Sequence, residues 1–236
     1  MTDSRTSSRD SDLEADNRRL RRLLDQRDAP GELRHRLQST LAMLRIIIRK
    51  SAAAKTDMEA YVAHLEDRLD AIARAQAAAD ERGSVELHDM VSEELHHYEI
   101  TEGERATISG PSVHFRPRAG QVLALAIHEL AVNAIEHGAL GAGAGQVQIS
   151  WAVETGDANP VLTLVWKELG SGTSEDRPEG FGTEVLTRTL AYELRAASKL
   201  GFEPDGVRFT LRFPLTDRIG QIEPTGPVGR GEASPA

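Results

Sequence analysis

The sequence predicts an α+β fold, in which a two-helix hairpin that dimerises into a four-helix bundle is followed by an α/β two-layer sandwich domain. Three observations support this prediction. Apolar residues recur at helical spacing in the first third of the chain, a long and almost wholly apolar helix follows, and alternating strands separated by glycine-rich loops fill most of the remainder.

Composition narrows the class of protein. The 236 residues are 39% hydrophobic, which is enough for a real core, and the formal charge of −9 argues against a nucleic-acid surface. The chain has no cysteine, which excludes disulfides, thiol nucleophiles and thiolate metal sites. No run approaches the roughly 18 apolar residues of a membrane span, and the start has no secretory signal. We therefore expect a cytoplasmic protein without a membrane segment.

The N-terminal part divides at Pro30-Gly31. Residues 1–30 predict a disordered start and a short coil with a thin seam of leucines. Residues 31–83 predict the hairpin, because two helices each carry one apolar stripe: Leu33, Leu37, Leu41, Leu44 and Ile48 on the first, and Met58, Val62, Leu65, Leu69 and Ile72 on the second. Two helices alone make a thin core, so we expect a homodimer that pairs two hairpins.

A mixed domain is predicted over residues 84–216, and a disordered, Gly- and Pro-rich tail over 217–236. The domain begins with a short strand and a helix. Its expected elements are strands near 85–87, 105–109, 147–153, 162–168, 199–203 and 207–213, and helices over 89–98, from Pro117 through His137, and after Gly182.

The helix that ends at His137 carries a polar strip into an apolar setting. Glu129, Asn133, Glu136 and His137 project within a sector of roughly 100°, while most other positions are apolar. A solvated face is the ordinary explanation of such spacing. A zinc clamp fails, because the position four residues after His128 is Val132.

Two glycine-containing segments suggest a ligand for this strip. Glu168 continues the inward face of an apolar strand and opens a loop with Gly170 and Gly172. A buried carboxylate needs a partner, and glycines permit close backbone approach. The segment from Gly180 to Thr183 then begins a helix, where free N–H groups can face an anion such as phosphate.

The three pieces in this order resemble the ATP-binding domain of histidine kinases, of the type also called Bergerat. Two motifs resemble the HWE family in particular: His128-Glu-Leu-Ala-Val-Asn133 and Trp166-Lys-Glu168. The segment Glu32-Leu-Arg-His-Arg36 is similar to the family's phosphoacceptor motif. The stretch Ile108-Ser-Gly-Pro111 resembles the family's entry to the nucleotide domain. The resemblance covers roughly residues 31 to 215.

The resemblance implies specific roles. His35 is the expected phosphoacceptor, oriented by Glu32, and Asn133 and Glu129 are the expected magnesium residues beside ATP. Glu168 is expected to accept the adenine amino hydrogen. The remaining nucleotide-pocket residues are His137, Gly170, Gly172, Gly180, Gly182 and Thr183. His128 and Trp166 are assigned to packing.

Departures from the family pattern keep a second hypothesis open. The family commonly has Lys-Tyr where this chain has Glu136-His137, and Lys and Asn where it has Gln38 and Ser39. The first hypothesis is an ATP-dependent histidine kinase that phosphorylates itself on His35 and then the receiver domain of a response regulator. The second is a phosphotransferase or scaffold dimer with a degenerate nucleotide site. Input would come from an upstream sensor or kinase partner.

Overall fold

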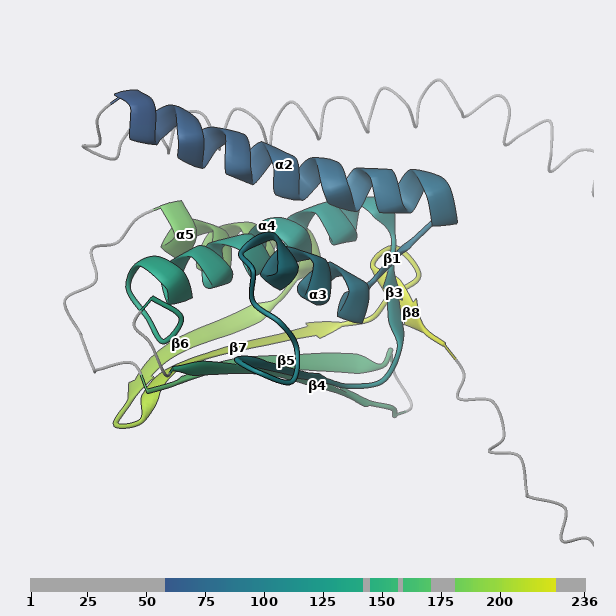
Figure 1. Cartoon of the computed structure of the whole chain (residues 1–236). Helices are drawn as coiled ribbons and strands as arrows, with labels where there is room; N and C mark the ends of the chain where they lie inside the picture. The colour runs from purple at the N-terminus through teal and green to yellow at the C-terminus, as the bar shows by residue number, and fades with distance from the viewer. Residues whose placement is uncertain (1–57, 142–144, 157–158, 171–180, 224–236) are drawn as a thin grey trace, which may run out of the picture. The chain divides into compact units, whose positions relative to one another are not determined.

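Helices cover one face of a twisted sheet in the described part of the chain (Figure 1). The structure is a computed structural model, and it describes residues 58–141, 145–156, 159–170 and 181–223. The helices are α2 (Met58–Arg82), α3 (Leu87–His97), α4 (Pro117–Glu136), α5 (Phe181–Glu184), the π-helical turn η1 (Val185–Thr189) and α6 (Leu190–Leu194). The strands are β1 (Val85–Glu86), β2 (Ala106–Ser109), β3 (Val113–Phe115), β4 (Gln146–Glu154), β5 (Val161–Leu169), β6 (Ala197–Glu203), β7 (Gly206–Pro214) and β8 (Gly220–Ile222).

The main sheet has the strand order β2-β4-β5-β7-β6. Strand β2 runs parallel to β4, and the other neighbours are antiparallel. Side chains alternate along β5, so that Leu162, Leu164, Trp166 and Glu168 are all buried. The predicted inward face that ends in a carboxylate is therefore confirmed, and Glu168 reaches the helical layer because it shares that face.

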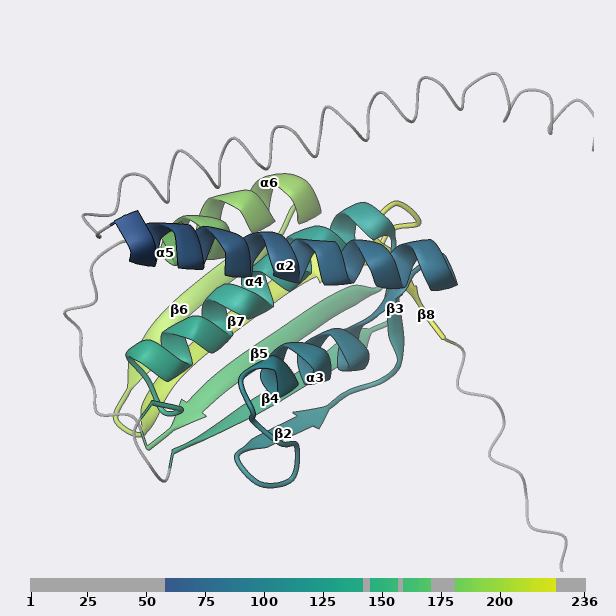
Figure 2. The same cartoon turned by 45° about the horizontal axis from the view of Figure 1, so that its top comes forward.

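Helix α4 lies at the centre of the helical layer (Figure 2). Pro117 begins the helix, where its missing N–H costs nothing, and residues 119–131 are all buried. Gly120 permits close contact with the small sheet β1-β3-β8, because a Cβ there would lie 2.8 Å from Val85 Cγ2. The prediction of a buried helix from Pro117 is confirmed.

Helix α2 packs antiparallel on α4, a contact that the sequence pattern does not predict. Residue 64 of α2 contacts residue 136 of α4, residue 68 contacts 129, and residue 76 contacts 121. The buried face of α2 is Ala71, Ile72, Ala75 and Ala79. It lies about 90° around the helix from the predicted stripe, on which Val62 is exposed and Leu65 and Leu69 are half-buried. Alanines on this face allow the two helices to approach closely.

The two-layer α+β architecture is confirmed, with corrections at element ends. The sequence misses β3 and β8, which pair with each other. The predicted tail from residue 217 is therefore wrong at its start, because β8 belongs to the fold. The helix expected over 89–98 is α3, which begins two residues earlier, where the Glu86 carboxylate accepts a hydrogen bond from Asp89 N–H.

Some predictions fall on residues that the structure does not describe. The coil at residues 13–23 and the first hairpin helix lie outside the described residues, and the dimer and the domain boundaries at residues 30 and 83 stay predictions. Within the described residues, no helix has both the length and the apolar character needed to cross a membrane.

Adjacent positions of β5 test the assignment of its two faces. We expect Leu164→Ala to lower the free energy of unfolding by about 3 kcal/mol, because it opens a cavity beneath α4. The control Thr163→Ala, on the opposite face of the strand, should change it by less than about 1 kcal/mol. Urea unfolding measures both, and equal losses would contradict the assignment.

Candidate functional site

Three of the predicted site residues come together where α5 meets α4. A Cβ added to Gly182 would lie 2.9 Å from Glu129 Oε2 and 3.2 Å from Asn133 Nδ2. The backbone of α5 therefore passes directly over the pair, and a side chain at this position would have to displace the Glu129 carboxylate. Glu129 is buried and Asn133 is half-buried, so a carboxylate and an amide oxygen, both suited to a hard cation, are available at one place.

Helix α2 contributes two more side chains to this strip. Arg68 Nε donates to Glu129 Oε1 at 2.6 Å, and Arg68 Nη2 donates to Oε2 at 3.3 Å. His64 Nε2 lies 3.8 Å from Glu136 Oε1, a looser contact at the surface. A buried carboxylate is costly without a cation, and Arg68 supplies that cation from a different helix.

Glu168 forms the opposite end of the site. Its Oε2 atom accepts a hydrogen bond from the Ala139 N–H at 3.0 Å, and Glu168 is 1% exposed. Gly138 packs against the same oxygen, because a Cβ there would lie 2.0 Å from it. The carboxylate therefore fixes the end of α4 to the end of β5.

Arg105 holds the segment that follows α4. Its guanidinium donates to the carbonyl oxygens of Gly145 at 3.1 Å, Ala139 at 3.2 Å and Leu140 at 2.9 Å. Three carbonyls on one cation define the course of the backbone beside Glu168.

A buried network lies on the other side of α4. His128 Nδ1 is 2.9 Å from Glu94 Oε1 and 3.4 Å from the Tyr98 hydroxyl, and Arg74 Nη2 donates to Glu94 Oε2 at 2.5 Å. Burial alone raises the pKa of Glu94. The hydrogen bond from His128 and the charges of His128 and Arg74 outweigh burial and leave that pKa below its usual value. Burial first, and then the charge of Glu94, raise the pKa of Tyr98. Glu94 of α3 thus links Arg74 of α2 to His128 of α4, and the buried His128 agrees with its assignment to packing.

The remaining predicted residues are placed unevenly. Gly170 has a φ of +83°, and Thr183 is half-buried at the start of α5. His137 is exposed at the end of α4, 3.7 Å from Glu136. His35, Glu32, Gly172 and Gly180 lie outside the described residues. Trp166 is fully buried, as expected, and its Nε1 atom has no hydrogen-bond partner in the described part of the chain.

Sequence reasoning missed Arg68, Arg105 and Glu94. Arg68 lies one helical turn from Ile72, which belongs to an apolar stripe. An arginine beside an apolar stripe could have indicated a partly buried cation that needs a carboxylate partner. The other two carry no local signal, because their partners are 20 residues or more away in the sequence.

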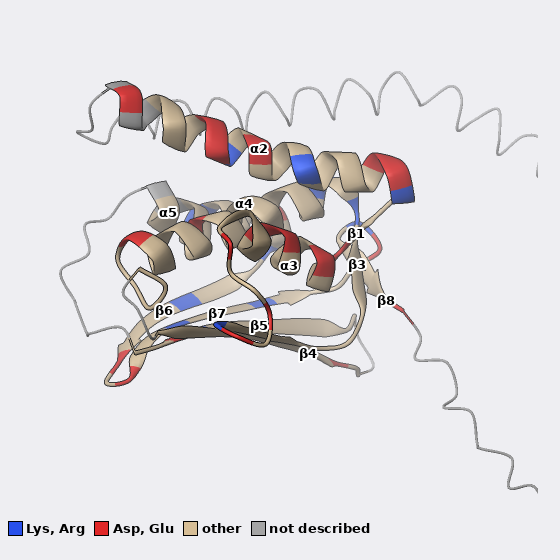
Figure 3. Cartoon of the chain, viewed as in Figure 1, with Lys and Arg blue, Asp and Glu red and all other residues tan. Residues whose placement is uncertain are grey.

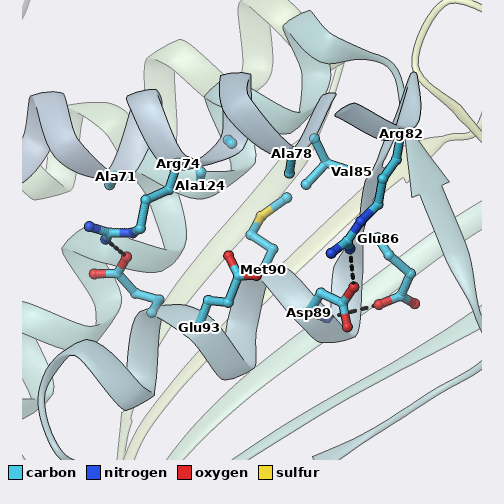
Figure 4. A pocket seen from close by; sticks show the side chains of 12 residues that line it. Ala71, Arg74, Ala78, Arg82, Val85, Glu86, Asp89, Met90, Glu93 and Ala124 are labelled. Atoms are coloured by element: carbon cyan, nitrogen blue, oxygen red, sulfur yellow. Dashed lines mark hydrogen bonds and ion pairs between the residues drawn. The ribbon is translucent and has the colours of Figure 1, made fainter. Parts of the chain in front are cut away.

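A small groove lies between α2 and α3 (Figure 4), and neither Glu129, Asn133 nor Glu168 lines it. Its volume of about 20 Å³ holds little more than one water molecule, far below a ligand pocket. The Asp89 carboxylate there pairs with Arg82 at 2.7 Å, and the Glu86 carboxylate caps α3 by accepting a hydrogen bond from the Asp89 N–H. Glu86, His88 and Asp89 lie close enough to share a cation, but these contacts already account for both carboxylates.

Comparisons with known proteins agree on one family. Residues 32–112 match the model of the HWE histidine kinases. The "Blue-light-activated histidine kinase 1" of Erythrobacter litoralis is 34% identical over 198 residues, which are 80% of this chain and 54% of that protein. The "Blue-light-activated histidine kinase" of Rhizobium johnstonii is 30% identical over 78% of this chain and 52% of its own length. The chain thus spans about half the length of these curated relatives.

Solved structures show the same fold. The histidine kinase domain of the Erythrobacter litoralis blue-light activated kinase superposes with a TM-score of 0.54 at 18% identity, over 76% of this chain and 85% of that domain.

Gly138 tests the contact between the ends of α4 and β5. We expect Gly138→Ala to lower the free energy of unfolding by about 2 kcal/mol, because the new methyl group must displace Glu168. Gly156→Ala is the matched control, since a Cβ there meets nothing within 4 Å. Chemical denaturation compares the two, and equal stabilities would show that Glu168 is not held against Gly138.

The Glu94 network predicts a pH-dependent stability. Because its folded-state pKa is lowered, Glu94 contributes stability above the unfolded-state pKa, and this is lost as pH falls through the folded value. We expect Glu94→Gln to cost about 3 kcal/mol at neutral pH. The gap to the unmodified protein should narrow below pH 4.5, the ordinary value. Urea unfolding over a pH series measures the gap, and a constant gap would contradict the prediction.

Proposed function

We propose that this chain, which belongs to the HWE histidine kinase family, is an ATP-dependent protein-histidine kinase. In this proposal His35 is phosphorylated, and the phosphoryl group then passes to an aspartate of a response-regulator receiver domain. The single observation that carries the proposal is the meeting of Glu129, Asn133 and Gly182 from two elements of the helical layer.

The residues of the site fit a magnesium-nucleotide. Oxygen donors on Glu129 and Asn133 suit a hard cation. At the other end of the site, Glu168 is a buried acceptor suited to an adenine amino group. On the same face of β5, the Trp166 indole N–H is a buried donor without a hydrogen-bond partner among the described residues. Glycines at 138 and 182 keep backbone close to both carboxylates. These features support the roles assigned to Asn133, Glu129 and Glu168. Gly170, Gly172, Gly180, Gly182, Thr183 and His137 complete the proposed pocket.

The proposed chemistry needs few groups from the protein. Bound magnesium would neutralise phosphate charge, and the protein would position the reactants. A neutral nitrogen of His35 forms a bond to the γ-phosphorus while the bond to the ADP oxygen breaks, and ADP leaves with that electron pair. The ring proton passes to Glu32 or to water. An imidazole is nucleophilic when neutral, which suits a pH near or above its ordinary pKa.

Glu136 favours the second candidate, a phosphotransferase or scaffold dimer without ATP binding. Its carboxylate lies on the polar strip of α4 and repels phosphate, but the residue is exposed and His64 lies beside it. Solvent and a partner both weaken such repulsion. The positive charge of Arg68, which is largely buried beside Glu129, is screened less by solvent than the exposed negative charge of Glu136. We therefore favour the kinase. Saturable binding of ATP with magnesium distinguishes the two candidates.

Incubation with labelled ATP and magnesium tests the phosphoacceptor. We expect the full chain to become labelled and His35→Ala to lose at least about 99% of the label, because the substitution removes the proposed nucleophile. The control His96→Ala removes an exposed imidazole from α3 and should label normally. Equal labelling of His35→Ala would refute the assignment.

A further inference from the structure

The polar strip of α4 carries negative charge where the proposed ligand is also negative. From residue 129 to residue 137 it offers two glutamates, one asparagine and one histidine, and neither lysine nor arginine. Phosphate oxygens placed beside two carboxylates are repelled unless cations intervene. The charge balance of the site therefore depends on what other elements bring to it.

Arg68 brings that positive charge from α2, along which acidic and basic residues are interspersed (Figure 3). The Arg68 guanidinium makes two unequal hydrogen bonds to the Glu129 carboxylate. The bond to Oε1 is 2.6 Å long, whereas the bond to Oε2 is 3.3 Å long. Oε2 is also the oxygen that a Cβ on Gly182 would approach to 2.9 Å. Arg68 thus anchors one oxygen and leaves the other directed toward Gly182 and Asn133. A carboxylate oxygen can accept more than one partner.

The position of Arg68 is fixed by helix docking. Two turns further along α2, Gln76 Oε1 accepts a hydrogen bond from Gln121 Nε2 at 2.6 Å, and Arg74 donates to Glu94, which pairs with His128. Arg68 itself is largely buried at this seam, with 12% of its side chain exposed. These contacts further along α2 help to set where the Arg68 guanidinium lies, and a shift of α2 would move it.

We propose that Arg68 is a positioning residue of the nucleotide site, which holds Glu129 in the orientation that supports magnesium. The inference rests on the proposed function. It means that the site is completed by α2, the helix that follows the phosphoacceptor segment in the chain, so that nucleotide affinity depends on how α2 is docked on α4.

Calorimetric titration of the full chain with ADP tests this, once with magnesium and once with a chelator. Arg68→Ala should weaken magnesium-ADP binding by about tenfold or more, the usual effect of losing a hydrogen bond to a charged group. Binding without magnesium should change much less. Arg68→Lys keeps the charge but not the forked geometry, and should fall between. Arg82→Ala is the matched control, since Arg82 is an exposed arginine of the same helix paired with Asp89, and should bind like the unmodified protein.

The outcomes separate the two claims. If the unmodified chain does not bind ADP with magnesium, the proposed function fails and this inference fails with it. If it binds, but Arg68→Ala binds equally well or more tightly, the inference alone is wrong. Equal losses with and without magnesium also overturn it, because they indicate collapse of the pocket. Arg68→Lys provides the same comparison if thermal unfolding shows that Arg68→Ala does not fold.

Discussion

The structure depends on one constraint: α4 is buried on nearly every side and still carries charged groups. A buried carboxylate or imidazole is tolerated only when it is paired, so each such group fixes another element. Glu129 is paired with Arg68 of α2, and His128 with Glu94 of α3. At the end of the helix, the Ala139 N–H is held by Glu168 of β5. The arrangement of the helical layer over the sheet follows from these pairs together with the apolar contacts around them.

The same constraint explains why the candidate site has two ends and why both are close to backbone. Glycine at 182 brings α5 over the Glu129 carboxylate, and glycine at 138 brings the chain against Glu168. Arg105 then holds the backbone that follows α4 through three carbonyl oxygens. Backbone held by such contacts has less conformational freedom to lose on binding a ligand. The Glu136 carboxylate is the group of the candidate site that opposes a phosphate, but it is exposed and solvent screens its charge.

Local periodicity predicted most of the fold, because a stripe of buried residues is written in the sequence itself. It predicted α4 and the inward face of β5 ending in Glu168, and it placed Gly182 at a helix start. It did not predict β3 and β8, which are three residues each and pair across more than a hundred positions. Nor did it predict the face of α2 that meets α4. Alanines give a weak apolar signal, and an arginine in a helix is ordinarily expected to face solvent. Pairs such as Arg68 with Glu129 are 61 residues apart and depend on packing that no local pattern encodes.

We propose that α4 and the ends of β5 and α5 form one magnesium-nucleotide pocket. The most direct measurement is a nuclear magnetic resonance titration of the full chain with ADP and magnesium, following the side-chain amide of Asn133 and the backbone amide of Ala139. The account predicts that both resonances move along one saturable curve, because they mark the two ends of the same pocket. Shifts elsewhere in the chain at saturation, with both of these amides unmoved, would contradict it.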